Sequence, residues 1–180
     1  HQMTMHPLNI FKHCPVCGSE NFIENDSRSK KCKDCSFVYY QNTAASVAAI
    51  IRRGKDEILV TRRAINPQKG KLDLPGGFVE FDETAEEALA REIKEELNIE
   101  IKNIKYEFTI PNNYSFSDMN IRTLDMFFSC EQDGECRIKA QDDVKDAKYM
   151  KINELKEDDF GLDSMKIAIR IIKNGAEMQK

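Results

Sequence analysis

The sequence predicts an α/β domain, a mixed β-sheet with helices packed against it, preceded by a small cysteine-rich module. Two patterns support this prediction. Short apolar segments typical of strands alternate with two segments of helical periodicity across residues 41–180. Four of the six cysteines also occur in two closely spaced pairs near the N-terminus. A length of 180 residues suffices for one domain with a small appendage and a sizeable hydrophobic core.

The composition is that of a globular protein, with 41% hydrophobic and 32% charged residues. The net charge is −4, from 27 basic and 31 acidic residues. This balance argues against a general nucleic-acid binder, which would be basic, but leaves a local basic patch open. No apolar run approaches the ~20 residues of a membrane span, and no secretory signal is recognised. We therefore expect a cytoplasmic protein that does not associate with membranes.

The cysteine pairs have two residues between the thiols, as Cys14–Cys17 and Cys32–Cys35. Two such turns supply the tetrahedral set of four thiolates that Zn²⁺ prefers. We predict a zinc ribbon over residues 9–40, whose closed site is structural because the module is too small to bury much core. Disulfide bonds or unconnected thiols are the alternative. Residues 1–8 are expected to form an N-terminal tail.

The other two cysteines, Cys130 and Cys136, flank an expected strand–turn–strand segment, and we predict that they are buried or free thiols. Basic residues gather beside the second cysteine pair: Arg28, Lys30, Lys31 and Lys33. They fit either a phosphate-contacting face or a solvated hairpin, and we favour the hairpin.

The main domain is expected to span residues 41–180. Residues 44–51 and 57–61 are apolar and flank a turn, which predicts a β-hairpin. The further segments that are typical of strands are residues 72–74, 101–111, 123–131 and 147–152. Residues 84–97 are the clearest helix, because Thr84 and Glu87 have the spacing of a capping box and apolar residues recur every four positions. Residues 160–173 predict a closing helix.

Three glutamates of the first helix, Glu92, Glu95 and Glu96, fall within an arc of about 100° beside its apolar stripe. They should therefore lie where the helix meets the domain. Like charges on one helical turn repel, so we expect a cation to offset them. Carboxylate oxygens suit a hard divalent ion, Mg²⁺ or Mn²⁺. A solvated acidic face is the alternative.

The surrounding motif favours the metal site. From Gly77 the sequence reads Gly77-x5-Glu83-x7-Arg91-Glu92-Ile93-x-Glu95-Glu96-x-Asn98-Ile99. This segment, residues 77–99, resembles the Nudix box, G-x5-E-x7-R-E-U-x-E-E-x-G-U, where U is a bulky aliphatic residue. Only Asn98 departs from it, and Asn tolerates the left-handed conformation that ends helices. By its strand pattern the resemblance extends over roughly residues 40–175.

The resemblance implies the α/β/α sandwich of Nudix proteins, which hydrolyse a nucleoside diphosphate linked to another group. The residues that match the family's metal ligands are Glu92, Glu95, Glu96 and, as a further ligand, the carbonyl of Gly76. Arg91 and Glu83 match the pair that braces the loop against the helix. The family's general base varies, and the candidates here are Glu95, Glu96, Asp142 and Asp143.

A four-cysteine ribbon directly before a Nudix domain is similar to the NADH pyrophosphatase group. That group carries the motif S-Q-P-W-P-F-P-x-S beyond its box, whereas residues 110–117 read IPNNYSFS and the chain has no Trp. We therefore infer a relative of that group rather than a member.

Several residues outside the box are candidates for substrate contacts. They are Arg63, Glu80, Tyr114 and Phe116, where the two aromatic rings would stack on a nucleobase. Basic residues near the box in sequence, namely Arg62, Arg63, Lys69 and Lys71, are candidates for phosphate contacts. Ordinary solvated or packed roles are the alternative for each.

Together these features predict a Mg²⁺-dependent Nudix pyrophosphohydrolase that cleaves a nucleoside diphosphate derivative such as NADH or ADP-ribose. Bound metal would neutralise phosphate oxygens and activate a water. The alternatives are removal of an NAD cap from RNA and a non-catalytic nucleotide-binding sensor. The family resemblance also implies a homodimer.

Overall fold

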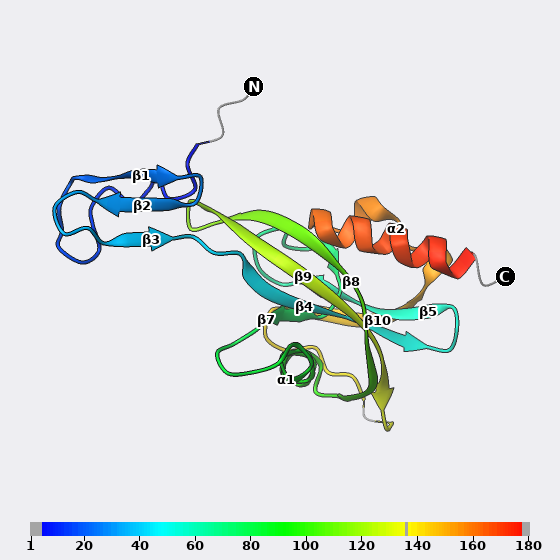
Figure 1. The fold of residues 1–180 in the computed structure, drawn as a ribbon. Coiled ribbons are helices and arrows are strands. Elements are labelled where there is room, and N and C mark those ends of the chain that lie inside the picture. Colours follow the sequence, from blue (N-terminus) through cyan, green and yellow to red (C-terminus); the bar gives the residue numbers. More distant parts are fainter. Residues whose placement is uncertain (1–4, 136, 178–180) are drawn as a thin grey trace. The chain divides into compact units, whose positions relative to one another are not determined.

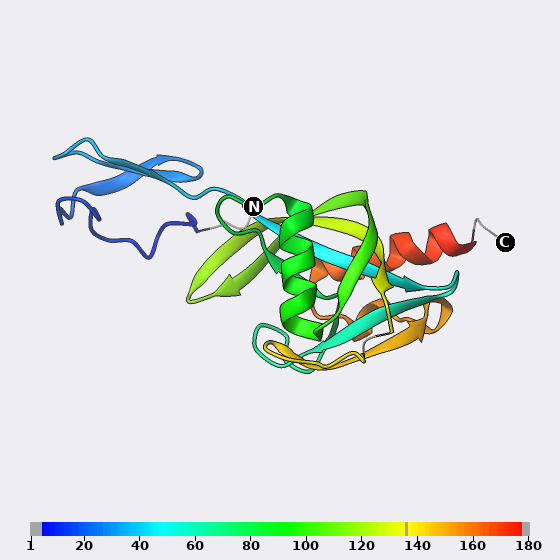
Figure 2. The same ribbon diagram turned by 90° about the horizontal axis from the view of Figure 1, so that it is seen from below.

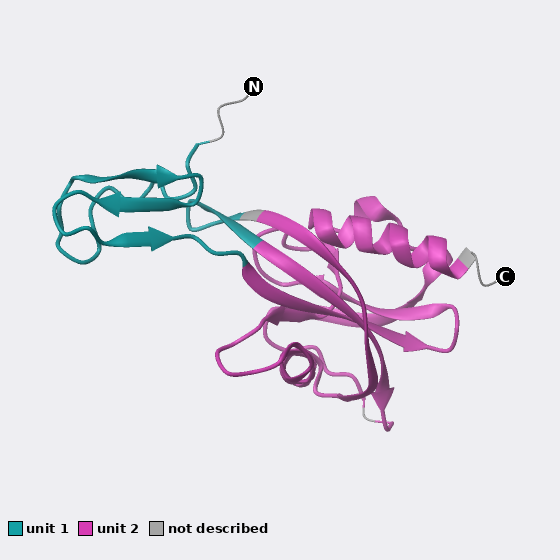
Figure 3. Ribbon diagram, viewed as in Figure 1, with its two compact units in different colours: residues 1–43, 114–122 teal, residues 44–113, 123–180 magenta. Residues whose placement is uncertain are grey.

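The computed structural model describes residues 5–135 and 137–177, apart from the side chains of Tyr114 and Glu177. The chain divides into two compact units (Figure 3). The N-terminal unit comprises the residues up to 43 together with 114–122, and the sandwich unit comprises residues 44–113 together with those from 123 onward. The predicted ribbon, residues 9–40, falls inside the N-terminal unit. Cys136 lies outside the described residues.

The N-terminal unit contains an antiparallel three-stranded sheet in the order β1-β2-β3 (Figure 1). Its strands are β1 (Phe22–Asp26), β2 (Ser29–Cys32) and β3 (Val38–Tyr40). The apolar core of this unit is small, consisting of Cys14, Phe22 and Cys32 with Phe11 and Phe37 against them. Leu8, in the segment expected to be a tail, is fully buried. A core with so few buried side chains contributes little stability, as expected for a module that depends on a bound metal.

The sandwich unit is built on a mixed seven-stranded sheet in which β4 and β9 run parallel. Its main path has the order β10-β5-β4-β9-β8, while β6 pairs with β5 and β7 pairs with β4. The strands are β4 (Ala44–Arg53), β5 (Glu57–Arg63), β6 (Leu72–Asp73), β7 (Gly76–Phe78), β8 (Glu100–Phe116), β9 (Met119–Asp133) and β10 (Val144–Lys151). The predicted hairpin is confirmed, since β4 and β5 are antiparallel neighbours joined through a turn at residues 54–56.

The two long helices, α1 (Ala85–Leu97) and α2 (Asp163–Glu177), cover opposite faces of this sheet (Figures 1 and 2). Strand β4 shows the division, because its alternate residues point to opposite faces. Val47 and Ala49 pack in the cluster that contains the apolar stripe of α1, whereas Ala48 and Ile50 pack in the cluster of α2. Burial on both faces explains the continuous apolar run of this strand. The predicted α/β/α sandwich is confirmed.

Several boundaries differ from the prediction; β10, for example, begins at Val144 rather than at residue 147. The closing helix begins at Asp163 rather than at residue 160, because Phe160 ends the short 3₁₀ helix η2 (Glu157–Asp159) with extended φ and ψ of −87° and 143°. Phe160 then bridges to Leu72 in β6 and is fully buried. A second 3₁₀ helix, η1 (Ile152–Glu154), follows β10.

Strands β8 and β9 are also longer than the predicted 101–111 and 123–131, and they continue to a tight turn. Ser117 and Asp118 have φ of 50° and 59°, the left-handed pair that a two-residue hairpin turn requires. Without Gly or Asn at these positions the turn had no clear sequence signal. The tip makes a hydrogen bond within the N-terminal unit, from Gln41 Nε2 to the Asn120 carbonyl at 3.0 Å.

Cys130 is a buried free thiol in the α1-side cluster, as predicted, and burial raises its pKa to about 12. The second strand of the strand–turn–strand segment expected around Cys130 is not formed, since β9 ends at Asp133 and residues 137–143 form no strand. None of the helices in the described residues is long and apolar enough to cross a membrane.

Candidate functional site

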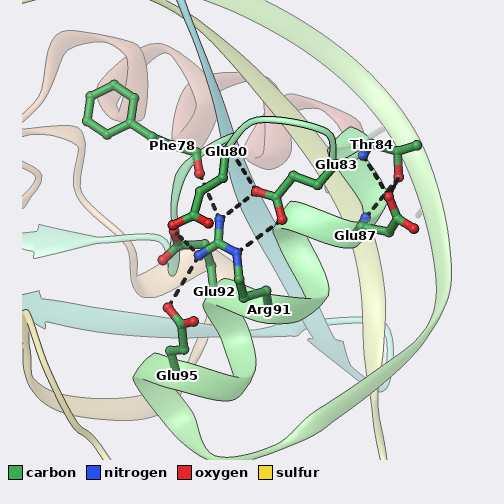
Figure 4. Close-up of polar contacts among 8 residues, drawn as sticks. All are labelled: Phe78, Glu80, Glu83, Thr84, Glu87, Arg91, Glu92 and Glu95. Carbon is green, nitrogen blue, oxygen red and sulfur yellow. Dashed lines mark hydrogen bonds and ion pairs between the residues drawn. The ribbon is translucent and has the colours of Figure 1, made fainter.

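Helix α1 carries the box glutamates and is capped at both ends. At its N-terminus the Thr84 hydroxyl accepts a hydrogen bond from the Glu87 N–H, and the Glu87 carboxylate accepts one from the Thr84 N–H, so the predicted capping box is confirmed (Figure 4). At its C-terminus Asn98 adopts the left-handed conformation, with φ of 55°, and its N–H donates to the Lys94 carbonyl. Asn98 thus supplies the geometry for which the motif uses Gly.

Arg91 ties this helix to the loop that precedes it. Its Nη2 and Nε atoms donate to the two carboxylate oxygens of Glu83 at 2.6 and 3.1 Å, and Nη2 also donates to the Phe78 carbonyl at 3.0 Å (Figure 4). Glu83 in turn accepts a hydrogen bond from the Glu80 N–H at 2.6 Å. The Arg91 guanidinium lowers the pKa of Glu83, so this carboxylate stays ionised. These contacts are what a brace between loop and helix requires.

The third nitrogen of Arg91, Nη1, contacts two of the predicted metal ligands. It lies 2.8 Å from Glu92 Oε1 and 3.3 Å from Glu95 Oε2 (Figure 4). The Glu95 side chain is 51% exposed and that of Glu92 only 17%. Arg91 therefore offsets part of the repulsion between these carboxylates.

Glu96 has a different environment from the other two glutamates. Its residue is 9% exposed, and its carboxylate accepts one hydrogen bond, from the Gly76 N–H at 3.1 Å. Burial raises the pKa of Glu96 well above its ordinary value, and the negative charges of Glu92, Asp73 and Asp143 raise it further, against the effect of the Gly76 hydrogen bond. Among the described residues Glu96 has no ion-pair partner. A buried carboxylate among other carboxylates is a donor set that fits a hard divalent cation.

The loop can approach these carboxylates because of two glycines in β7. Gly76 has φ of 149°, and a Cβ on it would overlap the Val47 carbonyl of the paired strand β4. A Cβ on Gly77 would lie 2.5 Å from the carboxylate of Glu92. Both glycines are therefore required, Gly76 for the close approach of the backbone to strand β4 and Gly77 for its close approach to the Glu92 side chain.

The structure does not bring Glu92, Glu95 and Glu96 to one point. The first two lie at Arg91, and Glu96 lies at Gly76. Within residues 5–135 and 137–177, one group of at least three His, Cys, Asp or Glu side chains has its ligand atoms close enough together to hold a metal ion. That group is the four cysteines. Arg91 Nη1 lies within ion-pair distance of both Glu92 and Glu95, so these two carboxylates share the Arg91 guanidinium as their cation.

The cysteine cluster has the dimensions of a four-thiolate metal site. Cys14 and Cys35 have Sγ atoms 3.6 Å apart, as do Cys17 and Cys32, and all four Sγ atoms lie within 4.8 Å of one another. A tetrahedron with Zn–S bonds of about 2.3 Å has S···S edges of about 3.8 Å. These cysteines are not disulfide-bonded. The backbone N–H of Cys35 helps to lower the pKa of Cys32 to about 7. Against a hydrogen bond from the Ser19 backbone, the neighbouring thiols instead raise the pKa of Cys17 to about 12, so Cys32 is the thiol of this pair that ionises first.

The candidate substrate contacts fall in both units. Arg63 is engaged within the sandwich unit, since Nη1 donates to Asp73 and Nε donates to the Pro67 carbonyl, both at 2.6 Å. Glu80 is exposed in the box loop. The Phe116 ring belongs to the N-terminal unit and is 56% exposed, while the Tyr114 side chain lies outside the described residues.

The two candidate bases on the later loop differ in their relation to the box. Asp142 and Asp143 are both exposed just before β10. Of the two, Asp143 acts on Glu96 through its charge, and its carbonyl accepts a hydrogen bond from the Ala64 N–H at 2.8 Å. Of these two acids, Asp143 is therefore the one whose charge acts on a residue of the box.

A pair of buried acids was missed by sequence reasoning. Asp73 is 7% exposed, pairs with Arg63, and acts through its charge on Glu96 of the box. Asp125 on β9 is 3% exposed, and its carboxylate accepts hydrogen bonds at 2.6 Å from the hydroxyls of Thr123 and Ser164. The available signal was the alternation Thr123-Leu124-Asp125, which places polar side chains on one face of a strand.

Comparison with known proteins identifies the family. A family model described as "NUDIX domain" matches residues 42–168. The chain belongs to the Nudix family. It is 27% identical over 150 residues to the NAD-capped RNA hydrolase NudC of Vibrio parahaemolyticus, an alignment that covers 83% of this chain and 55% of that protein. The chain thus spans about half the length of this curated relative.

Solved Nudix structures support the fold assignment. The crystal structure of a NUDIX hydrolase from Nitrosomonas europaea aligns with a TM-score of 0.70 at 24% identity, covering 94% of this chain and 92% of that one. A bifunctional NMN adenylyltransferase/ADP ribose pyrophosphatase from Francisella tularensis aligns with a TM-score of 0.56 at 25% identity, covering 77% of this chain and 42% of that one. The Nudix fold therefore accounts for the sandwich unit.

Proposed function

We propose that this Nudix protein is a divalent-metal-dependent pyrophosphohydrolase that cleaves the diphosphate of a nucleoside diphosphate derivative. The observation that carries the proposal is the environment of Glu96, a buried carboxylate beside Glu92 and Asp73 with no cationic partner in the described part of the chain. So much buried negative charge destabilises the protein unless a cation binds there.

Glu92, Glu95, Glu96 and the carbonyl of Gly76 would hold the metal, which we propose to be Mg²⁺ or Mn²⁺. A bound divalent ion neutralises the diphosphate oxygens and lowers the pKa of a coordinated water. Arg91 positions the ligands rather than the substrate, because its guanidinium contacts Glu83 and the carboxylates themselves.

A carboxylate must also accept the proton of the attacking water. The candidates are Glu95, which is half exposed and within the box, Glu96, and on the later loop Asp142 or Asp143. Asp143 is favoured over Asp142 because its charge acts on Glu96.

The N-terminal unit is proposed to hold one Zn²⁺ through Cys14, Cys17, Cys32 and Cys35. Their spacing fits a tetrahedral site, and such a closed site is structural. Free thiols of this kind need a reducing compartment, so we propose a cytoplasmic location. We also propose a homodimer, as the family resemblance implies, to be measured by light scattering coupled to size-exclusion chromatography.

Dinucleotides such as NADH and sugar nucleotides such as ADP-ribose are the proposed substrates. The support is the neighbour from Francisella tularensis, a bifunctional NMN adenylyltransferase/ADP ribose pyrophosphatase that is 25% identical to this chain. Removal of an NAD cap from RNA is the second candidate, and the name of the curated Vibrio relative favours it. Both candidates involve cleavage of the same kind of bond, in a diphosphate that links adenosine to a second ribosyl group.

The test is a turnover panel of NADH, ADP-ribose, diadenosine polyphosphates, nucleoside triphosphates and NAD-capped RNA, with Mg²⁺ or Mn²⁺. Glu96→Gln is the test variant, and Glu86→Gln is the matched control because Glu86 is an exposed acid of the same helix. We expect metal-dependent turnover that falls at least a hundredfold in Glu96→Gln and persists in Glu86→Gln.

The same panel separates the alternatives. Turnover of NAD-capped RNA well above that of free NADH would assign the chain to cap removal. Binding of ADP-ribose with no turnover of any compound would identify a non-catalytic sensor and overturn the enzyme proposal. Calorimetric titration with Mn²⁺ gives an independent readout, since Glu96→Gln should weaken Mn²⁺ binding and Glu86→Gln should not.

A further inference from the structure

A pocket of about 600 Å³ lies in the sandwich unit, where β5, β6 and β10 meet the turn of η2. Four basic side chains line it, from Arg62, Lys69, Lys71 and Lys148. Leu72 and Met150 provide its apolar lining, and Asp159 is its one acidic lining residue. This volume lies within the range of small-molecule sites, roughly 300–1,000 Å³.

The pocket lies on the face of the sheet opposite the box helix. Arg62 is the register partner of Leu72, so the two side chains share a face, and Leu72 packs in the α2-side cluster. Lys148 shares a face with Met150, which packs against the same cluster. The adjacent Arg63 points to the other face, where it binds Asp73. Neighbouring arginines therefore serve different sites.

The positive charge of this pocket is only partly offset. Arg62 Nη1 donates to the Gly70 carbonyl at 2.7 Å, and Lys71 Nζ donates to the Asp158 carbonyl at 3.0 Å. These carbonyls fix the side chains in place without cancelling their charge. Among the described residues, the one ion pair of these four side chains is a long contact of 3.5 Å from Arg62 to Asp146.

The side chains of Lys69 and Lys148 make no hydrogen bond or ion pair with the described residues. Four cations therefore face one lining carboxylate, in a protein whose net charge is −4. A local excess of positive charge around a hollow attracts anions.

We propose that this pocket binds the phosphate group of a nucleotide, at a site separate from the box. Guanidinium and ammonium groups are the usual partners of phosphate oxygens. Met150, which is partly exposed, offers an apolar surface for the attached nucleoside, with the buried Leu72 beside it. The phosphate can come from a free nucleotide or from one nucleotide of an RNA chain, since both present the same chemistry.

The test is calorimetric binding to the full chain without added divalent ions, using AMP, adenosine and a 5′-phosphorylated RNA pentamer. The test variant is Lys69→Gln/Lys148→Gln. The matched control is Lys105→Gln/Lys151→Gln, which removes the same charge from exposed lysines that do not line the pocket. We expect the pocket variant to weaken binding of the phosphorylated ligand at least tenfold and the control to leave it unchanged, with adenosine binding far more weakly than AMP.

The comparison of AMP with the RNA pentamer identifies the source of the phosphate. Tighter binding of AMP than of the pentamer supports a free nucleotide, and tighter binding of the pentamer supports an RNA chain. The proposal is overturned if neither ligand binds, or if the pocket and control variants weaken binding equally. In wild-type protein labelled at methionine methyl groups, the Met150 resonance must also shift on titration; an unchanged Met150 signal with bound ligand places the ligand elsewhere.

Discussion

Arg91 holds Glu83 through two parallel hydrogen bonds, of 2.6 Å from Nη2 and 3.1 Å from Nε, across eight residues of sequence. The same guanidinium reaches Glu92 and Glu95 through Nη1. One side chain therefore sets both the loop conformation and the positions of two proposed metal ligands. Because a planar guanidinium makes this fork and an ammonium cannot, the site depends on arginine rather than on positive charge alone.

Replacing Arg91 with Lys keeps the charge but removes the fork. We expect the free energy of unfolding of the sandwich unit to fall by about 2 kcal/mol, the scale of one or two hydrogen bonds to a charged group. Denaturation followed by helical circular dichroism measures this, since both long helices belong to that unit. Arg53→Lys is the control, because the Arg53 side chain is 57% exposed and its single ion pair with Glu57 should contribute at most about 1 kcal/mol. Equal losses in both variants would contradict the special role of Arg91.

Gly77→Ala should displace the carboxylate of Glu92, because the added Cβ would lie 2.5 Å from it. We expect at least a tenfold loss of metal-dependent turnover. Gly175→Ala is the matched control, since its Cβ would meet no atom within 4 Å. In helix α2 that change should stabilise the protein by about 1 kcal/mol. Unchanged turnover in Gly77→Ala would mean that Glu92 needs no such close approach.

Arg63→Ala leaves Asp73 buried without its cation. At pH 7 we expect the free energy of unfolding to fall by about 3–5 kcal/mol, as when other buried ion pairs lose one partner. Burial already raises the pKa of Asp73, an effect that Arg63 opposes. The folded state of the variant therefore takes up a proton at higher pH than the unfolded state, so its deficit is full at neutral pH and shrinks as pH falls through the raised pKa.

Denaturation at pH 7 and pH 5 measures this pH dependence. The double variant Arg63→Ala/Asp73→Asn is the control, because removing the unpaired charge should restore much of the stability and abolish the pH dependence. A deficit in Arg63→Ala that stays constant with pH would show that lost packing, not charge, is responsible.

Cys14→Ser should abolish binding of the proposed structural metal. We expect about one Zn per chain in the wild type and far less in the variant, measured by elemental mass spectrometry. The helical circular dichroism signal should persist, since the described residues of the N-terminal unit form no long helix. Cys130→Ala is the control, because Cys130 lies in the core of the sandwich unit and should not affect the zinc content. If gently purified wild-type protein contained no zinc, that result would contradict the ribbon assignment.

Much of the fold follows from local sequence. Thr84 and Glu87 define the start of α1, and the apolar run of β4 reflects burial on both faces of the sheet. The start of α2 did not follow, because the bridge from Phe160 to Leu72 is a contact between segments far apart in the sequence. The turn at Ser117 and Asp118 carried no glycine to signal it.

The sequence by itself determined which residue types gather at each site, because the box and the two cysteine pairs are patterns of spacing. Only the tertiary structure decided which of these residues are buried. Glu95 and Glu96 are neighbours on one helix, yet Glu96 packs against the loop at Gly76 while Glu95 is half exposed. Likewise, Arg62 lines a basic pocket and Arg63 pairs with Asp73 on the opposite face. Spacing sets the direction of a side chain on its own element, but burial and pairing depend on the elements that pack against it.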